Sequence, residues 1–163
     1  MLCYSVGMKL WKVITLSILI LAGSLIPSVV SSAPKSKFEY NPCEAISYSD
    51  KLFCSVNRYR NENGVNTLRY STEASRIAKD RAVHLCQSKT FTHEGWETFL
   101  NTEYAQAGEN LAQEFDNHED VLTDWVNSPL HNENLLADWD SMGIYTKPCE
   151  GRNVTAQIFL TLE

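Results

Sequence analysis

The order of hydrophobic patterns along this chain limits its fold more than any other feature. Apolar side chains recur with the period of a helix in residues 47–65, 68–86 and 118–128. The period then changes, and residues 141–147 and 153–163 are rich in β-forming residues on either side of a turn-like stretch. Helices followed by an antiparallel pair predict an α+β layered domain with a C-terminal β-hairpin.

The residues that flank the helical patterns support the same assignment. Gly64 stands where a helix end tolerates left-handed geometry. Ser71 and Asn117 each precede an apolar helical pattern and can cap it. Pro129 follows Ser128 and suits the first position of a short fourth helix, with Ser128 as its cap.

The N-terminal segment, residues 1–33, has the features of a secretory signal. Lys9 and Lys12 precede a short apolar run, and Ser31 and Ala33 are the small residues that a signal peptidase reads. An uncleaved membrane anchor is the alternative, but a span needs ~20 mostly apolar residues, and Pro27 interrupts this run. We therefore predict cleavage after Ala33, no stable membrane span afterwards, and a secreted protein that is extracellular or periplasmic.

Cleavage would leave one domain of ordinary size. We expect a loose, polar entry segment over residues 34–48 and a folded domain over residues 49–163. The signal segment contains two lysines and no acid, so the remaining 12 basic and 20 acidic side chains give a net charge of −8. This acidic balance argues against nucleic acid as a partner, because a phosphate backbone requires clustered lysine and arginine.

Four cysteines remain after Cys3 leaves with the signal. An even number in an exported protein predicts two disulfides, and three pairings of Cys43, Cys54, Cys86 and Cys149 are possible. We prefer Cys43–Cys54, which is local, and Cys86–Cys149, which would join a helix end to a late turn. A zinc–thiolate site is disfavoured because no C-x-x-C knuckle occurs.

Three polar residues are candidates for a site. His93 lies in a glycine-containing loop between Phe91 and Trp96, Glu109 lies in the motif G-E-N-L-A, and His131 lies in the first turn of the predicted fourth helix. Each residue alone is more often structural than functional, so their meaning depends on the motifs around them.

Several short motifs follow one another in an order that resembles a known family. They are N-R-Y-R-N-E-N-G-V-N-T-L-R-Y-S, A…R-A…F-T-H, G-E-N-L-A, D-W-V-N-S-P-L-H-N-E-N-L-L, M-G-I-Y and V-T-A-Q-I-F. This order resembles the CAP superfamily, which includes cysteine-rich secretory proteins, venom allergens and plant pathogenesis-related proteins. The motif S-P-x-H-x-x-N is most similar to its short bacterial branch. The resemblance covers roughly Ser49 to Leu162.

The resemblance implies a three-layer α-β-α sandwich with a cleft. In animal and plant relatives, two histidines and two acids line that cleft, and a divalent metal is often bound to the histidines. His93 matches the first family histidine and Glu109 the first acid. The chain departs from the pattern at Ser128, which stands in the place of the second acid, and at Val154, which stands in the place of the second histidine.

A smaller cluster is therefore expected in this chain. His131 can supply the missing imidazole, and Asn134, one turn later, can orient it. We predict a cleft formed by these two residues with His93 and Glu109, with His93 and His131 as ligands for a zinc or calcium ion. The Glu109 carboxylate is expected to accept from backbone N–H groups and to point at a histidine, and Gly108 to let the backbone turn near the site.

These residues favour binding over catalysis. The sequence offers no distinct nucleophile, so the first interpretation is a secreted, non-enzymatic module whose cleft binds a small apolar or peptide-like ligand, or an extracellular macromolecule such as another protein. A metal-dependent hydrolase that uses His93, His131 and Glu109 is the first alternative. A structural module of the cell envelope is the second.

Overall fold

The computed structural model describes residues 41–44, 47–100 and 104–162. The predicted signal segment lies outside these residues. Chain contacts separate a unit Met1–Lys37 from a unit Phe38–Glu163, and the fold below is that of the second unit. In the described part of the chain, no helix is both long enough and apolar enough to cross a membrane.

The described residues form four α-helices, two short 3-10 helices and four strands. In chain order these are η1 (Pro42–Glu44), α1 (Tyr48–Glu62), β1 (Arg69–Tyr70), α2 (Thr72–Ser88), η2 (Trp96–Phe99), β2 (Tyr104–Gln113), α3 (His118–Asn127), α4 (Pro129–Leu136), β3 (Ser141–Cys149) and β4 (Arg152–Leu162). The four predicted helices and the C-terminal hairpin are confirmed. The hydrophobic pattern does not predict β1 or the full length of β2.

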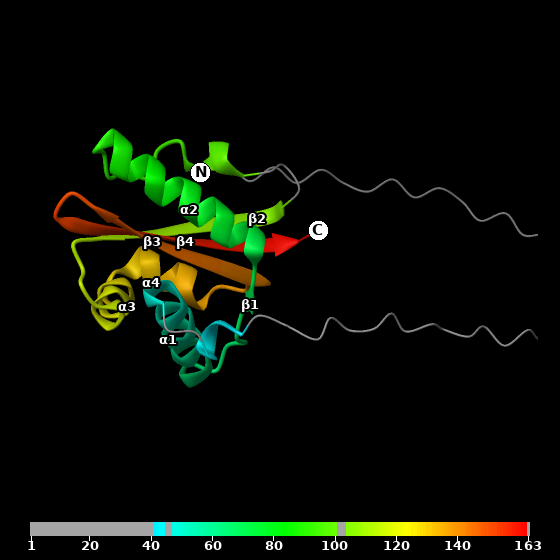
Figure 1. Cartoon of the computed structure of the whole chain (residues 1–163). Coiled ribbons are helices and arrows are strands. Elements are labelled where there is room, and N and C mark those ends of the chain that lie inside the picture. Colours follow the sequence, from blue (N-terminus) through cyan, green and yellow to red (C-terminus); the bar gives the residue numbers. More distant parts are fainter. Residues whose placement is uncertain (1–40, 45–46, 101–103, 163) are drawn as a thin grey trace, which may run out of the picture. The chain divides into compact units, whose positions relative to one another are not determined.

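The strands form one sheet in the order β1-β3-β4-β2. β4 pairs antiparallel with both β3 and β2, whereas β1 pairs parallel with β3. Helix α2 covers one face of the sheet, and α1, α3 and α4 lie on the other, as Figure 1 shows. The predicted three-layer α-β-α sandwich is confirmed, and β2 is one of its two edge strands.

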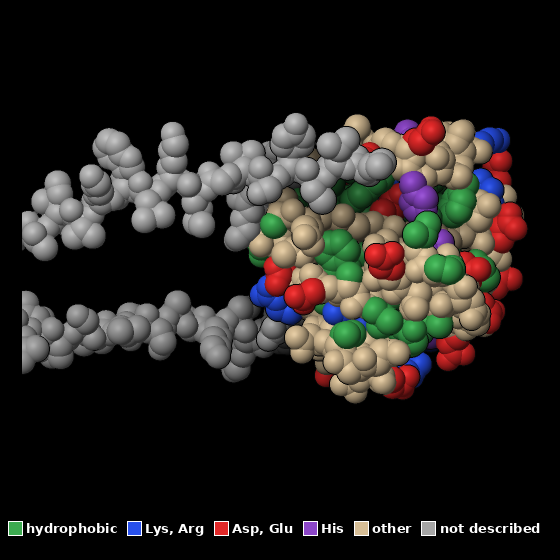
Figure 2. All heavy atoms as spheres, turned by 180° about the vertical axis from the view of Figure 1, so that it is seen from behind, with side chains coloured by type: hydrophobic (Ala, Val, Ile, Leu, Met, Phe, Trp, Pro, Cys, Tyr) green, Lys and Arg blue, Asp and Glu red, His purple; other side chains and the backbone are tan. Residues whose placement is uncertain are grey.

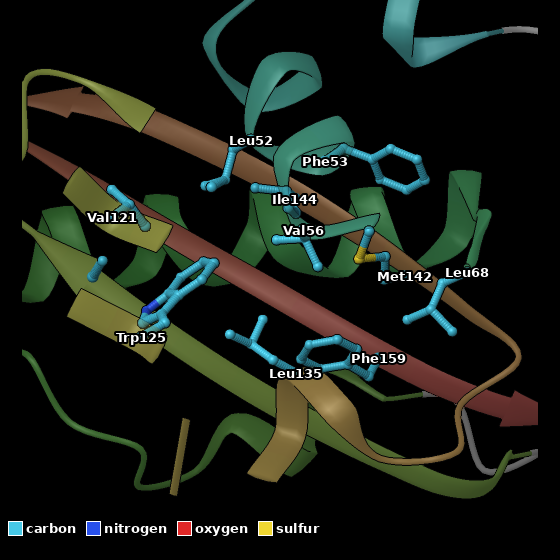
Figure 3. Close-up of a cluster of buried hydrophobic side chains, with 11 residues drawn as sticks. Leu52, Phe53, Val56, Leu68, Val121, Trp125, Leu135, Met142, Ile144 and Phe159 are labelled. Atoms are coloured by element: carbon cyan, nitrogen blue, oxygen red, sulfur yellow. The ribbon is translucent and has the colours of Figure 1, made fainter. Parts of the chain in front are cut away.

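Each face of the sheet has its own hydrophobic core. Strand alternation divides β4 between them, because Phe159 packs with α1, α3 and α4 while Ile158 and Leu160 pack with α2. Figure 3 shows the first core around Trp125, which is fully buried. The Trp125 indole Nε1 also donates to the Leu111 carbonyl over 2.9 Å, so α3 is fixed to β2 by both packing and a hydrogen bond.

Local capping explains most of the helix boundaries. The Ser71 hydroxyl accepts from the Ala74 N–H, and the Asn117 side chain accepts from the first turn of α3, as predicted. Gly64 follows α1 with a φ of 74°, the left-handed geometry expected there. The prediction for Ser128 is wrong in one respect: its side chain makes no cap hydrogen bond, and only its carbonyl accepts, from the Asn132 N–H over 2.8 Å.

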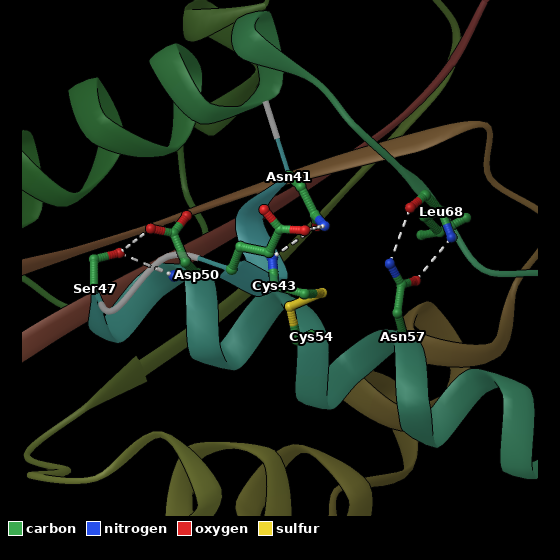
Figure 4. The surroundings of a disulfide bond; sticks show 8 residues. Asn41, Cys43, Ser47, Asp50, Cys54, Asn57 and Leu68 are labelled. Carbon is green, nitrogen blue, oxygen red and sulfur yellow. Dashed lines mark hydrogen bonds between the residues drawn. A yellow bond between two sulfur atoms is a disulfide. The ribbon is translucent and has the colours of Figure 1, made fainter. Parts of the chain in front are cut away.

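Two disulfides close the domain. Cys43 bonds to Cys54 and thereby ties η1 to α1 (Figure 4). Cys86 bonds to Cys149 and ties the last turns of α2 to the end of β3. The structure thus has the pairing that we preferred among the three possible ones.

Candidate functional site

The candidate residues meet around the edge strand β2, although they come from three different elements. His93 comes from the loop between α2 and η2, and His131 comes from the first turn of α4. Glu109 lies in the middle of β2 and pairs in register with Ile158. Its carboxylate is therefore held by a sheet rather than by a loop, which gives the site a rigid base.

The partner that fixes Glu109 is Arg81 of α2. Arg81 Nε lies 2.7 Å from Glu109 Oε2, and both side chains are 1% exposed. Arg81 Nη2 donates to the Thr92 carbonyl, and the guanidinium carbon lies 5.8 Å from the ring centroid of Phe99. We expected backbone N–H groups to hold this carboxylate, and in their place the structure has a buried ion pair.

Arg81 is not among the candidate site residues chosen from the sequence. It lies four residues after Ile77 and four before Leu85, both of which are buried on the inner face of α2. A charged residue within an apolar stripe predicts a buried partner, since an unpaired buried charge is costly. That pattern is present in the sequence, but it does not identify the partner.

His93 is held by the same carboxylate. Its Nδ1 lies 2.9 Å from Glu109 Oε1, while 55% of the side chain remains exposed. An ionised carboxylate only accepts hydrogen bonds, so Nδ1 carries the proton and Nε2 of the neutral ring is left as an acceptor. The chain Arg81–Glu109–His93 thus orients one accessible imidazole.

His131 faces His93 across the site. The two ring centroids are 6.1 Å apart with an interplanar angle of 54°. The Nδ1 atom of His131 is buried and has no hydrogen-bond partner among the described residues. Burial, and secondarily the nearby His93, lower the pKa of His131 below its usual value of 6.5. The ring is therefore biased toward its neutral form.

Asn134 has a different role from the one we expected. Its amide does not bond to the His131 ring, and donates instead to the Glu109 carbonyl over 3.2 Å and to the Asn110 side chain over 2.9 Å. Asn110 in turn donates to the His131 carbonyl over 3.2 Å. Asn134 therefore joins α4 to β2 and positions the backbone of His131 indirectly.

Gly108 also acts differently from the prediction. It lies within β2 and pairs with Phe159, so no turn occurs there. A Cβ atom at this position would lie 2.9 Å from the indole ring of Trp139. Glycine is required for the close approach of this ring to the strand, not for a change of chain direction.

Exposed apolar residues lie close in sequence to the two histidines. Among the described residues, three large hydrophobic side chains are classed as exposed: Phe91 at 37%, Leu130 at 76% and Leu162 at 54%. Phe91 lies two residues before His93, and Leu130 directly precedes His131. Figure 2 shows the face seen from behind, where histidine side chains lie beside a hollow that contains hydrophobic side chains.

The arrangement of these elements agrees with a comparison of the sequence with protein families. The model of the CAP family, described as the cysteine-rich secretory protein family, matches residues 55–162. The chain belongs to this family. A search of curated proteins gave no significant match.

CAP and related domains of known structure share this fold. An outer surface protein of Borrelia burgdorferi is similar with a TM-score of 0.64 and 22% identity over 69% of this chain and 91% of that one. An extracellular protein with an SCP domain from Bacillus anthracis has a TM-score of 0.62 and 19% identity over 70% of this chain, which spans only 40% of that protein. Venom allergen-like protein 4 of Schistosoma mansoni has a TM-score of 0.58 and 10% identity over 73% of this chain and 91% of its own.

Two positions of the CAP site have other uses in this chain. Val154 is fully buried in the core beneath α2 and pairs in register with Gln113. Ser128 connects α3 to α4. Neither residue adds a carboxylate or an imidazole to the cluster of His93, Glu109 and His131.

These residues, as arranged, do not provide a complete metal site. Catalytic zinc is held by three protein ligands, and the Glu109 carboxylate already accepts from Arg81 and contacts His93. Within the described ranges, no three histidine, cysteine, aspartate or glutamate side chains are grouped to hold a metal. Binding of zinc or calcium by His93 and His131 stays a prediction.

Proposed function

We propose that this CAP domain is exported and acts as a non-enzymatic binding module, with a ligand that is apolar or peptide-like. The observation that carries the proposal is the pair of imidazoles at β2. The oriented ring of His93 faces that of His131, and each histidine has an exposed apolar residue close to it in sequence, Phe91 and Leu130. Apolar surface around a few fixed polar groups is typical of ligand sites.

The chemistry of the cluster formed by His93, Glu109 and His131 favours binding. The Glu109 carboxylate accepts from the buried Arg81 and contacts His93, so both of its oxygens already have partners within the protein. The four cysteines of the described domain are all in disulfides. The remaining polar groups can accept or donate hydrogen bonds to a ligand, whereas none is an activated nucleophile of the kinds that enzymes use.

The disulfides support export. Two such bonds in a domain of this size are usual in oxidising compartments and rare in the cytosol. Together with the predicted signal over residues 1–33, they favour an extracellular or periplasmic location. N-terminal sequencing of the protein from the culture medium tests this, with a start at Pro34 expected and a cell-bound, uncleaved chain contradicting it.

The binding role is testable with two defined probes, decanoate and N-acetyl-phenylalanine amide. Titration of ¹⁵N-labelled protein should shift the amide resonances of His93, Glu109 and His131 for at least one of them. Leu130→Ser should weaken that binding, whereas the matched control Leu162→Ser should not, because Leu162 is also exposed but lies at the end of β4. Equal weakening by both variants, or no binding of either probe, would overturn the proposal.

An assay for turnover separates binding from hydrolysis. The wild-type protein is incubated with p-nitrophenyl acetate and added zinc, beside His93→Ala and His131→Ala. We expect no turnover above that of the variants. Zinc-dependent turnover that both substitutions abolish, in variants that remain folded, would replace the binding role with a metal-dependent hydrolase.

A further inference from the structure

The outer edge of β2 is covered along only half of its length. β2 pairs with β4 alone, and in an antiparallel pair alternate residues direct their N–H and C=O groups away from the partner strand. The carbonyls of Glu109 and Leu111 point outward, because they accept from the side chains of Asn134 and Trp125. The C-terminal half of the edge is thus closed by α3 and α4.

The N-terminal half of the same edge has no such cover from the described residues. By the same alternation Ala107 directs both backbone groups outward, and within the described ranges no hydrogen bond to either group is found. The pairing of β2 with β4 shifts between Tyr104 and Gln106, which places a bulge at Ala105. An unpaired strand edge is a template for another strand.

A pocket adjoins this open edge. It has a volume of about 390 Å³ and is lined by Trp96, Glu97 and Leu100 together with residues 104–107 of β2. Neither His93 nor His131 lines it, and Ala107 lies two residues before Glu109 on the same strand. The pocket could accept one apolar side chain of a chain segment paired with Ala107.

The carboxylate of Glu97 beside the pocket favours a basic chain segment as the ligand. Glu97 is exposed, and no ion pair of its carboxylate is found among the described residues. Arg76, on α2, is already paired with Glu73 and Asp80. The pocket therefore presents a negative charge that a lysine or arginine side chain of a ligand would complement.

We propose that this part of β2 binds an extended, basic peptide segment by strand addition. The segment pairs with the outward N–H and C=O of Ala107, places an apolar side chain between Trp96 and Leu100, and places a basic one beside Glu97. This inference goes beyond the proposed binding function, because it assigns a second ligand to another part of β2. Main-chain pairing supplies the affinity and the flanking pocket supplies the specificity.

The direct test uses the peptide acetyl-Lys-Val-Lys-Val-Lys-amide and the complete folded domain with its disulfides. Hydrogen exchange of individual amides is measured by NMR with and without the peptide. The Ala107 N–H should be protected only in the complex. The Gly108 N–H, which faces β4, should be protected in both states and serves as the internal control. Unchanged exchange at Ala107 under saturating peptide would overturn the proposal.

Changes to the peptide test the mode of binding. Methylation of the backbone nitrogens on one edge of the peptide should lower its affinity by about tenfold, because it removes main-chain donors. The acidic peptide acetyl-Glu-Val-Glu-Val-Glu-amide should bind more weakly than the basic one. Equal affinity of all three peptides would contradict strand addition.

Changes to the protein test the location. Glu97→Lys should reduce the affinity for the basic peptide and improve it for the acidic one. Glu94→Lys is the matched control, since Glu94 is exposed three residues earlier and does not line the pocket. Ala107→Pro removes the outward N–H while leaving the pairing of Gly108 with β4, and a thermal melt establishes that it folds. Full peptide affinity in folded Ala107→Pro would count against the proposal.

The outcomes for the two sites are separable. If the small probes shift His93 and His131 but the peptide leaves Ala107 unprotected, the binding function holds and strand addition fails. If neither the probes nor the peptide bind, both fail. His131→Ala should weaken the small probes and leave the peptide affinity unchanged, because the histidine does not line the pocket.

Discussion

Arg81 Nε lies 2.7 Å from Glu109 Oε2, and both side chains are 1% exposed. This pair joins α2 to the edge strand β2 across 28 residues of chain. Because the same carboxylate contacts Nδ1 of His93, the orientation of the accessible imidazole depends on a buried arginine.

Loss of Arg81 should therefore affect both stability and the site. Arg81→Met leaves the Glu109 carboxylate buried without its cation, and we expect the free energy of unfolding to fall by about 3–5 kcal/mol. Urea denaturation measures this. The double variant Arg81→Met with Glu109→Leu should lose less than the single variant, because no charge remains buried. A single variant as stable as the wild type would contradict the ion pair.

His131 should make stability depend on pH. Burial and the neighbouring His93 lower its pKa in the folded state, so the unfolded chain takes up a proton first as the pH falls below about 6.5. The free energy of unfolding should therefore decrease as the pH falls below about 6.5, and His131 should not change it at higher pH. Urea denaturation at several pH values should show this slope, and His131→Gln should reduce it. If the free energy of unfolding of the variant depends on pH as strongly as that of the wild type, other titrating groups cause the dependence.

Gly143 should tolerate no side chain. A Cβ atom there would lie 2.1 Å from the backbone nitrogen of Ser75 and 2.4 Å from the carbonyl carbon of Ala74, because α2 packs directly on β3. Gly143→Ala should destabilise the domain by about 1–3 kcal/mol or more, since backbone atoms must move. Gly108→Ala is the comparison. Its Cβ atom would meet the side chain of Trp139 rather than backbone atoms, so the loss of stability should be smaller. Thermal melts of both variants check this order.

The two disulfides should differ in their contribution. Cys86–Cys149 spans 63 residues and Cys43–Cys54 spans 11. The loop-entropy model then predicts that replacing Cys86 and Cys149 by alanine lowers the free energy of unfolding by about 1.5 kcal/mol more than replacing Cys43 and Cys54. Guanidinium denaturation of the two double variants gives the difference. A larger loss for Cys43 and Cys54 would show that their contacts outweigh chain entropy.

The elements with local causes could be predicted from the sequence alone. Helical periodicity, the Ser71 and Asn117 caps, and the proline at the start of α4 depend on residues within a few positions of one another. The same is true of the C-terminal hairpin. The order of the family motifs also identified His93, Glu109 and His131 as candidate site residues.

How those residues are held depends on tertiary packing. The partner of Arg81 is set by where α2 lies on the sheet, and the two-residue strand β1 exists because it pairs with β3. The glycine at position 108 resembles a turn residue in the sequence, whereas in the fold it makes room for the ring of Trp139. The physical reason is that a side chain's immediate sequence specifies its backbone preference, whereas burial, charge pairing and an open strand edge arise only when distant segments pack together.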